Sequence, residues 1–115
     1  MKIDYNNKTF RLVHSSKNGE LTNETIFRYK QKGNILTSSY SCASIRQGQL
    51  LGLVDEKGNI EIHYHQINNR NIINTGICHS KPEILPSGKI RLHEQWKWTS
   101  GDQSIGKSIL EEIRE

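Results

Sequence analysis

The chain has 115 residues, of which 33% are hydrophobic and 24% charged, and 16 Lys and Arg against 12 Asp and Glu give a net charge of +4. This length predicts a single domain over residues 1–115 with one modest core. The basic residues are scattered and no apolar run is long enough for a membrane helix, so we expect neither nucleic acid nor a membrane as partner.

The first half of the chain predicts four short strands joined by polar turns. They cover residues 9–14, 24–30, 35–41 and 50–55, with a loop over residues 15–23 after the first. Within residues 24–30, Thr25, Phe27 and Tyr29 alternate onto one face. A hairpin turn is predicted around Gly33, because glycine accepts positive φ without strain.

The second half predicts strands over residues 60–66, 72–78 and 89–99. Between Pro82 and Pro86 we expect at best an edge strand, because proline cannot donate to a β-ladder. Residues 107–113 fit either a strand or a short helix, and their alternation favours a strand. Strand 60–66 places on one face Ile60, Ile62, Tyr64 and Gln66.

The long strand over residues 89–99 holds both tryptophans and the clearest alternation in the chain. One face is apolar apart from Glu94 and consists of Ile90, Leu92, Glu94, Trp96 and Trp98. The other face is polar and consists of Arg91, His93, Gln95 and Lys97. The pattern alone leaves open which of these faces points inward.

Short strands joined by Gly-Asn turns, without a convincing helix in the middle of the chain, predict an all-β fold. We expect a small antiparallel up-and-down meander that closes into a barrel of about 8–10 strands, because closure removes exposed sheet edges. The interior of such a barrel is filled by side chains or by one small ligand.

Three motifs give the chain a family resemblance over most of its length. They are Tyr64-His65-Gln66, Gly76-Ile77-Cys78 followed by Ser80-x-Pro82-Glu83, and Gly88-Lys89-x-Arg91-Leu92-His93-Glu94-x-Trp96-x-Trp98-Thr99-Ser100-Gly101-Asp102. The chain resembles a family of short bacterial proteins with avidin-like or lipocalin-like barrels. The resemblance implies a meander around a central cavity and carries no ligand with it.

Members of that family are often labelled N-acetylglutamate synthase. Acetyl transfer from coenzyme A needs a Q/R-x-x-G-x-G/A loop that opens a helix and holds the pyrophosphate. The nearest match is Gln49-Leu-Leu-Gly52-Leu-Val54, which has valine at the last small position and is followed by a turn. The residues therefore do not support that activity, and no nucleophile motif points to another enzyme.

We expect the barrel to bind a small molecule in its interior, without catalysis and without a cofactor. A binding cavity is mostly apolar with a few placed hydrogen-bonding groups. The candidates are aromatic or polar side chains on otherwise apolar strand faces, namely Tyr29, Tyr64, Gln66, Glu94, Trp96 and Trp98. The alternative is that both tryptophans are simply core. The oligomeric state stays open, with a homodimer as one option.

A second hypothesis is a cupin-like, metal-dependent enzyme. His63 and His65 form an H-x-H pair on one strand face, and His93 could be a third ligand. A cupin carries a glutamate a few residues after H-x-H, whereas Gln66 to Asn69 follow here. Solvent-facing histidines are the simpler interpretation. A third hypothesis is a protein-interaction domain with a fully packed barrel and an exposed edge at Pro82–Pro86.

The first residues lack the apolar core of a signal peptide, so we expect a cytoplasmic protein. In that compartment Cys42 and Cys78 are expected to be free thiols.

Overall fold

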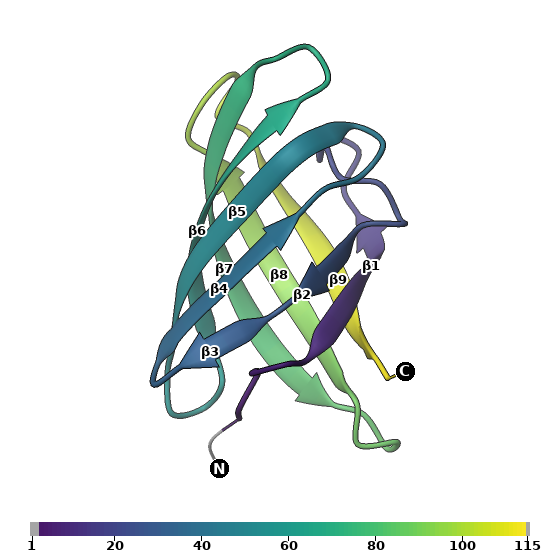
Figure 1. The fold of residues 1–115 in the computed structure, drawn as a ribbon, viewed down its shortest axis with the longest axis vertical. Helices are drawn as coiled ribbons and strands as arrows, with labels where there is room; N and C mark the ends of the chain where they lie inside the picture. Colours follow the sequence, from purple (N-terminus) through teal and green to yellow (C-terminus); the bar gives the residue numbers. More distant parts are fainter. Residues whose placement is uncertain (1–2, 115) are drawn as a thin grey trace.

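The computed structural model describes residues 3–114, and these residues form nine β-strands and no helix (Figure 1). All neighbouring strands pair antiparallel, which confirms the predicted all-β meander. Within the described part of the chain, no helix is long and apolar enough to cross a membrane. The strands are β1 (Thr9–Ser15), β2 (Ile26–Arg28), β3 (Lys30–Lys32), β4 (Ile35–Tyr40), β5 (Ile45–Val54), β6 (Ile60–Asn68), β7 (Ile73–Ile84), β8 (Ile90–Trp98) and β9 (Ile105–Ile113).

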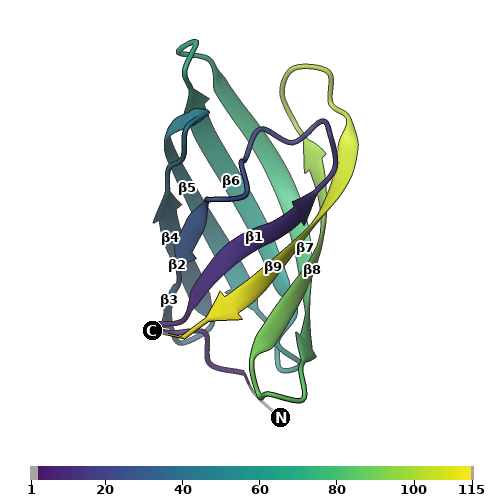
Figure 2. The ribbon, with the colours of Figure 1, turned by 90° about the vertical axis from the view of Figure 1, so that its right-hand side faces the viewer.

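The sheet is curled into a nearly closed barrel, and its two end strands, β2 and β3, follow one another directly in the chain. The strand order is β2-β1-β9-β8-β7-β6-β5-β4-β3, and only Tyr29 separates β2 from β3. The backbone N–H of Tyr29 donates to the carbonyl of Lys8, and the N–H of Asn7 donates to the carbonyl of Tyr29, both at 2.9 Å. The predicted strand over residues 24–30 thus joins β1 on one side and β4 on the other (Figures 1 and 2).

Two strands extend further than predicted. β5 begins at Ile45, ahead of the apolar run that starts at Leu50, because its first residues pair with β6 although they are mostly polar. β7 continues to Ile84 and includes Pro82, which lies opposite Leu92 of β8. The pairing of β7 with β6 already ends at Ser80, so Pro82 lies where β7 pairs with β8 alone. The missing N–H of Pro82 therefore removes no hydrogen bond between β7 and β6.

The last predicted strand is confirmed. β9 covers Ile105–Ile113 and pairs with both β8 and β1. Its inward face carries Ser108, Leu110 and Glu112, which are all buried.

The end of the barrel near the chain termini is filled by side chains. The hydroxyl of Tyr5 donates to the carbonyl of Gly58 at 2.6 Å, and the rings of Phe10 and Tyr29 pack with their centroids 4.9 Å apart. Buried Glu112 accepts the N–H of Ile90 at 3.0 Å. Space for a ligand therefore lies toward the other end.

Candidate functional site

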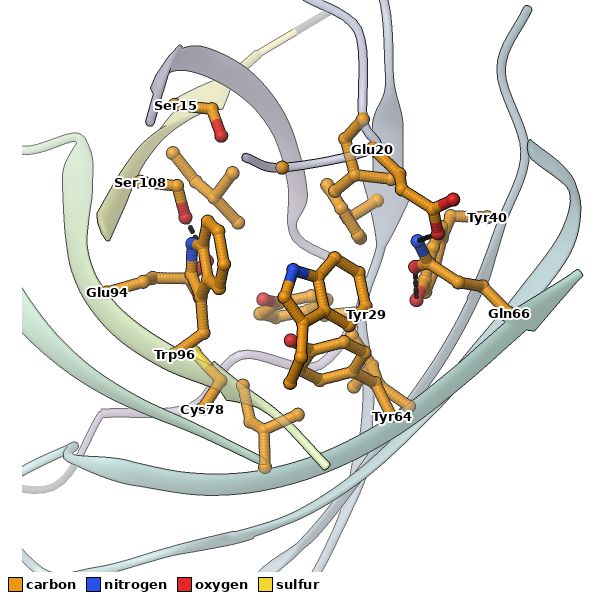
Figure 3. A pocket seen from close by; sticks show the side chains of 17 residues that line it. Ser15, Glu20, Tyr29, Tyr40, Tyr64, Gln66, Cys78, Glu94, Trp96 and Ser108 are labelled. Carbon is orange, nitrogen blue, oxygen red and sulfur yellow. Dashed lines mark hydrogen bonds between the residues drawn. The ribbon is translucent and has the colours of Figure 1, made fainter. Parts of the chain in front are cut away.

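The barrel encloses a cavity of about 60 Å³ toward the end opposite the termini. One water molecule needs roughly 10–15 Å³ on the same measure, so the cavity has room for several waters or a small molecule. Its wall includes all six residues that the sequence predicted as ligand-binding, namely Tyr29, Tyr64, Gln66, Glu94, Trp96 and Trp98. The inward face of β8 is therefore the one that carries the tryptophans (Figure 3).

Three aromatic rings of the wall lie over glycines on the neighbouring strands. Tyr40 is paired with Gly48, Tyr64 with Gly76, and Trp96 with Gly106. A Cβ on any of these glycines would come within 2.2 Å of the facing aromatic side chain. The rings can therefore lie against the wall, as aromatic side chains do over strand glycines, and the space inside them stays open.

The two tryptophans and Tyr64 form one aromatic side of the cavity. The ring centroids of Trp96 and Trp98 are 5.6 Å apart, and those of Tyr64 and Trp98 are 5.7 Å apart, both in edge-to-face orientation. The indole N–H of Trp98 donates to the carbonyl of Asn18 at 3.1 Å. These contacts hold the three rings in place along the cavity wall.

Glu94 is the one carboxyl on the inward face of β8. It lies between Ser80 and Ser108 of the neighbouring strands, and the Ser108 hydroxyl donates to its Oε1 at 3.1 Å. Enclosure by protein raises the pKa of Glu94 to about 7, against the opposing effect of the neighbouring Ser108 and Ser80 hydroxyls and the Cys78 thiol. Glu94 borders the cavity, so a ligand inside it can contact the carboxyl.

Tyr29 contributes a hydroxyl whose hydrogen-bonding capacity is unused. The side chain is 0% exposed, and its oxygen has no hydrogen-bond partner among residues 3–114. Burial raises the pKa of Tyr29 well above its ordinary value, so the hydroxyl stays protonated. A buried hydroxyl without a partner costs about 1–3 kcal/mol, and a molecule in the cavity could supply that partner after a small shift of the wall, because the oxygen exposes no surface in the empty barrel.

The loop of residues 16–25 crosses the open end of the barrel and is tied there by Glu20. The carboxylate of Glu20 accepts hydrogen bonds from the side-chain amides of Gln66 at 2.9 Å, Asn68 at 2.9 Å and Asn74 at 3.0 Å. Burial alone would raise the pKa of Glu20, but these three hydrogen bonds outweigh it and hold the pKa below its ordinary value. Figure 3 shows Glu20 beside Gln66, across the cavity from Glu94.

Tyr40 also belongs to this hydrogen-bonded group, because its hydroxyl donates to Oε1 of Gln66 at 2.8 Å. Gln66 is thus held from both sides and is 2% exposed. Among the wall residues that sequence reasoning missed are three that hydrogen-bond to other wall residues: Glu20, Tyr40 and Ser108. The alternation of Leu36, Ser38 and Tyr40, and of Ser108 with Leu110, could have placed Tyr40 and Ser108 inside, whereas nothing local marks Glu20.

A family model described as "Avidin-like protein" matches residues 3–113. The chain belongs to this avidin-like family. No curated protein and no solved structure matches it. The avidin-like part of the resemblance seen in the sequence is therefore confirmed.

The avidin-like barrel separates the three histidines of the cupin-like hypothesis. His63 and His65 lie exposed on the outer face of β6, where the imidazole of His63 is 3.4 Å from Glu61. His93 lies exposed on β8, where its Nε2 is 2.8 Å from the Glu83 carboxylate. Lys97 of β8 lies level with His63 of β6, because both are in register with Ile77 of β7. His93 is four residues from Lys97 along β8, which is about 13 Å at roughly 3.3 Å per residue. Across residues 3–114, no three His, Cys, Asp or Glu side chains are grouped to hold a metal.

The structure also locates the other segment and residues that the sequence analysis considered, the Gln49–Val54 stretch and the two cysteines. The stretch Gln49–Val54, compared above with an acetyl-coenzyme A loop, lies inside β5 and is followed by a turn. Cys42 and Cys78 are both free thiols. Cys78 borders the cavity, and burial raises the pKa of its thiol well above the ordinary value.

Proposed function

We propose that this protein binds a small molecule in the cavity of its barrel. The observation that carries the proposal is a mostly apolar cavity bordered by two polar groups without full partners, the Glu94 carboxyl and the Tyr29 hydroxyl. Ligand sites have this composition, with apolar walls and a few placed polar groups that fix the orientation of the ligand. A barrel built only for stability would fill this space with aliphatic side chains, as it does at Ile90 and Leu92.

We propose that the role is binding, without catalysis, and that it is exercised in the cytoplasm. The Cys78 thiol in the cavity wall is held in its protonated form by burial, which is the unreactive state of cysteine. Two free thiols are also in keeping with a reducing compartment.

Two adjacent leucines of β5 allow a matched test of the proposal. Leu50 lines the cavity and is 8% exposed, whereas Leu51 points outward and is 59% exposed. Leu50→Phe adds volume inside the cavity, and Leu51→Phe makes the same chemical change outside the barrel. Overpacking at Leu50 costs about 1–3 kcal/mol, so circular dichroism is used to check that both variants keep the β-fold.

The natural chain and both variants are screened against a broad panel of small metabolites by tryptophan emission and thermal unfolding. We expect at least one compound to change the emission of Trp96 or Trp98, and to raise the melting temperature by roughly 10 °C at a hundredfold excess over its Kd. Leu51→Phe should respond like the natural chain, and Leu50→Phe should not respond. The proposal fails if no compound has an effect, or if Leu50→Phe binds as well as Leu51→Phe.

A further inference from the structure

The cavity carries negative charge within a protein of positive net charge. Two carboxyl side chains, Glu20 and Glu94, border it, and no Lys, Arg or His does among the described residues. The whole chain has a net charge of +4. The basic residues are thus placed elsewhere, and the electrostatic field inside the cavity disfavours an anionic ligand.

The two carboxyl groups differ in how well they are satisfied. Glu20 accepts three amide hydrogen bonds at 2.9 to 3.0 Å and ties the loop of residues 16–25 to the barrel. Glu94 accepts a hydrogen bond from the Ser108 hydroxyl at 3.1 Å, the Ser80 hydroxyl and the Cys78 thiol also lie against it, and it forms no ion pair within the described part of the chain. These three groups are all neutral, so the enclosed carboxylate is stabilised most by a positively charged hydrogen-bond donor.

The rest of the wall also suits a cation. Trp96, Trp98, Tyr64 and Tyr29 surround the space with aromatic rings, whose faces attract ammonium and guanidinium groups. The unpartnered oxygen of Tyr29 can accept an N–H once the wall has shifted enough to expose it. An ion such as Mg²⁺ or Ca²⁺ would need several oxygen ligands, and no group of three suitable side chains occurs in residues 3–114.

We propose that the ligand is a small organic cation, with an ammonium or guanidinium group on a compact apolar body. The charged group donates to the Glu94 carboxylate and to the Tyr29 oxygen, and the apolar body packs against the tryptophans. This inference rests on the proposed binding function, because it names the chemical class of the ligand for the same cavity.

Three compact probes that share a tert-butyl group and differ in charge test the inference. They are tert-butylammonium, tert-butanol and pivalate, titrated into the natural chain by calorimetry at pH 8. We expect tert-butylammonium to bind at least about tenfold more tightly than either other probe, since a hydrogen bond to a charged group is worth that factor or more. Its affinity should rise from pH 6 to pH 8 as Glu94 loses its proton, and that of tert-butanol should not change.

Three variants assign the effect to the cavity. Glu94→Gln removes the charge without changing the shape, and it should abolish the preference for the ammonium probe and the pH dependence. Tyr29→Phe should weaken the binding of the ammonium probe several-fold and leave the pH dependence of that binding unchanged. Glu61→Gln makes the same change on the outer face of β6, where the side chain is 57% exposed, and it should behave like the natural chain. Circular dichroism and thermal unfolding establish that each variant is folded.

The possible failures are distinguishable. If tert-butanol or pivalate binds as tightly as tert-butylammonium in the natural chain, and Leu50→Phe abolishes this binding, the cavity binds molecules but the cationic class is refuted. The same holds if no tert-butyl probe binds and the metabolite panel yields only neutral or anionic ligands. If neither the probes nor the panel bind, the proposed function itself fails and this inference fails with it.

Discussion

Replacing Glu94 with glutamine should make the unliganded protein more stable at pH 8 and leave its stability nearly unchanged at pH 5. The carboxyl is enclosed inside the barrel, and the Ser108, Ser80 and Cys78 side chains beside it are all neutral. Ionisation in this place lacks the solvation that the same group has in the unfolded chain. Glutamine keeps the shape of the side chain and removes the ionisation.

The size of the effect follows from the pKa of Glu94, which burial raises from the ordinary 4.5 to about 7. Below pH 4.5 the group is protonated in the folded and unfolded chain alike, so it has no effect on stability. Between pH 4.5 and about 7 the unfolded chain releases the proton first, so stability falls as the pH rises. Above pH 7 the loss is complete at about 3 kcal/mol, because one pKa unit is worth roughly 1.4 kcal/mol.

Urea unfolding followed by tryptophan fluorescence measures this effect. The free energy of unfolding is determined for the natural chain, Glu94→Gln and the outer-face control Glu61→Gln at pH 5 and pH 8. We expect Glu94→Gln to gain about 3 kcal/mol over the natural chain at pH 8 and less than about 1 kcal/mol at pH 5. Equal differences at the two pH values, or a gain for Glu61→Gln as large as that for Glu94→Gln, would refute the reasoning.

Three further changes have definite expected results. Gly76→Ala should cost about 1–3 kcal/mol in urea unfolding, because the new Cβ would lie 2.2 Å from the Tyr64 hydroxyl oxygen and push the ring into the cavity; an unchanged midpoint would contradict this. Glu20→Gln should speed amide hydrogen exchange in the loop of residues 16–25 by about tenfold or more, because a neutral amide cannot accept all three hydrogen bonds; unchanged protection would contradict this. Tyr29→Phe should raise the free energy of unfolding of the unliganded protein by about 1 kcal/mol by removing an unpartnered hydroxyl, and a loss of stability would show that the hydroxyl has a partner.

The site residues that the sequence could predict are those set by strand alternation. A strand points every second residue to the same face, so Tyr64 and Gln66 followed from Ile60 and Ile62, and Glu94 followed from the tryptophans beside it. The same rule favoured solvent for His63 and His65, which the structure places on the outer face. Alternation is a local property, and it needs no knowledge of which strands pair.

What the sequence could not predict depends on contacts between distant parts of the chain. Glu20 accepts hydrogen bonds from residues 46, 48 and 54 positions away, so no pattern around it marks its role. β5 begins at Ile45 because a partner strand exists for its polar first residues. Pro82 is tolerated in β7 because β6 has already ended at that level, which only the register reveals.

The stability effects of Glu94 and Tyr29 bear on what the cavity is for. Above pH 7 the free energy of unfolding of the unliganded barrel is about 4 kcal/mol lower than that of a variant with glutamine at 94 and phenylalanine at 29. Domains are usually stable by only about 5–15 kcal/mol. Nothing in the packing requires this loss, because Ile90 and Leu92 fill the same face of β8 with aliphatic side chains. A ligand that donates to both groups would remove both costs on binding, so the two residues that weaken the empty barrel are those expected to stabilise the occupied one.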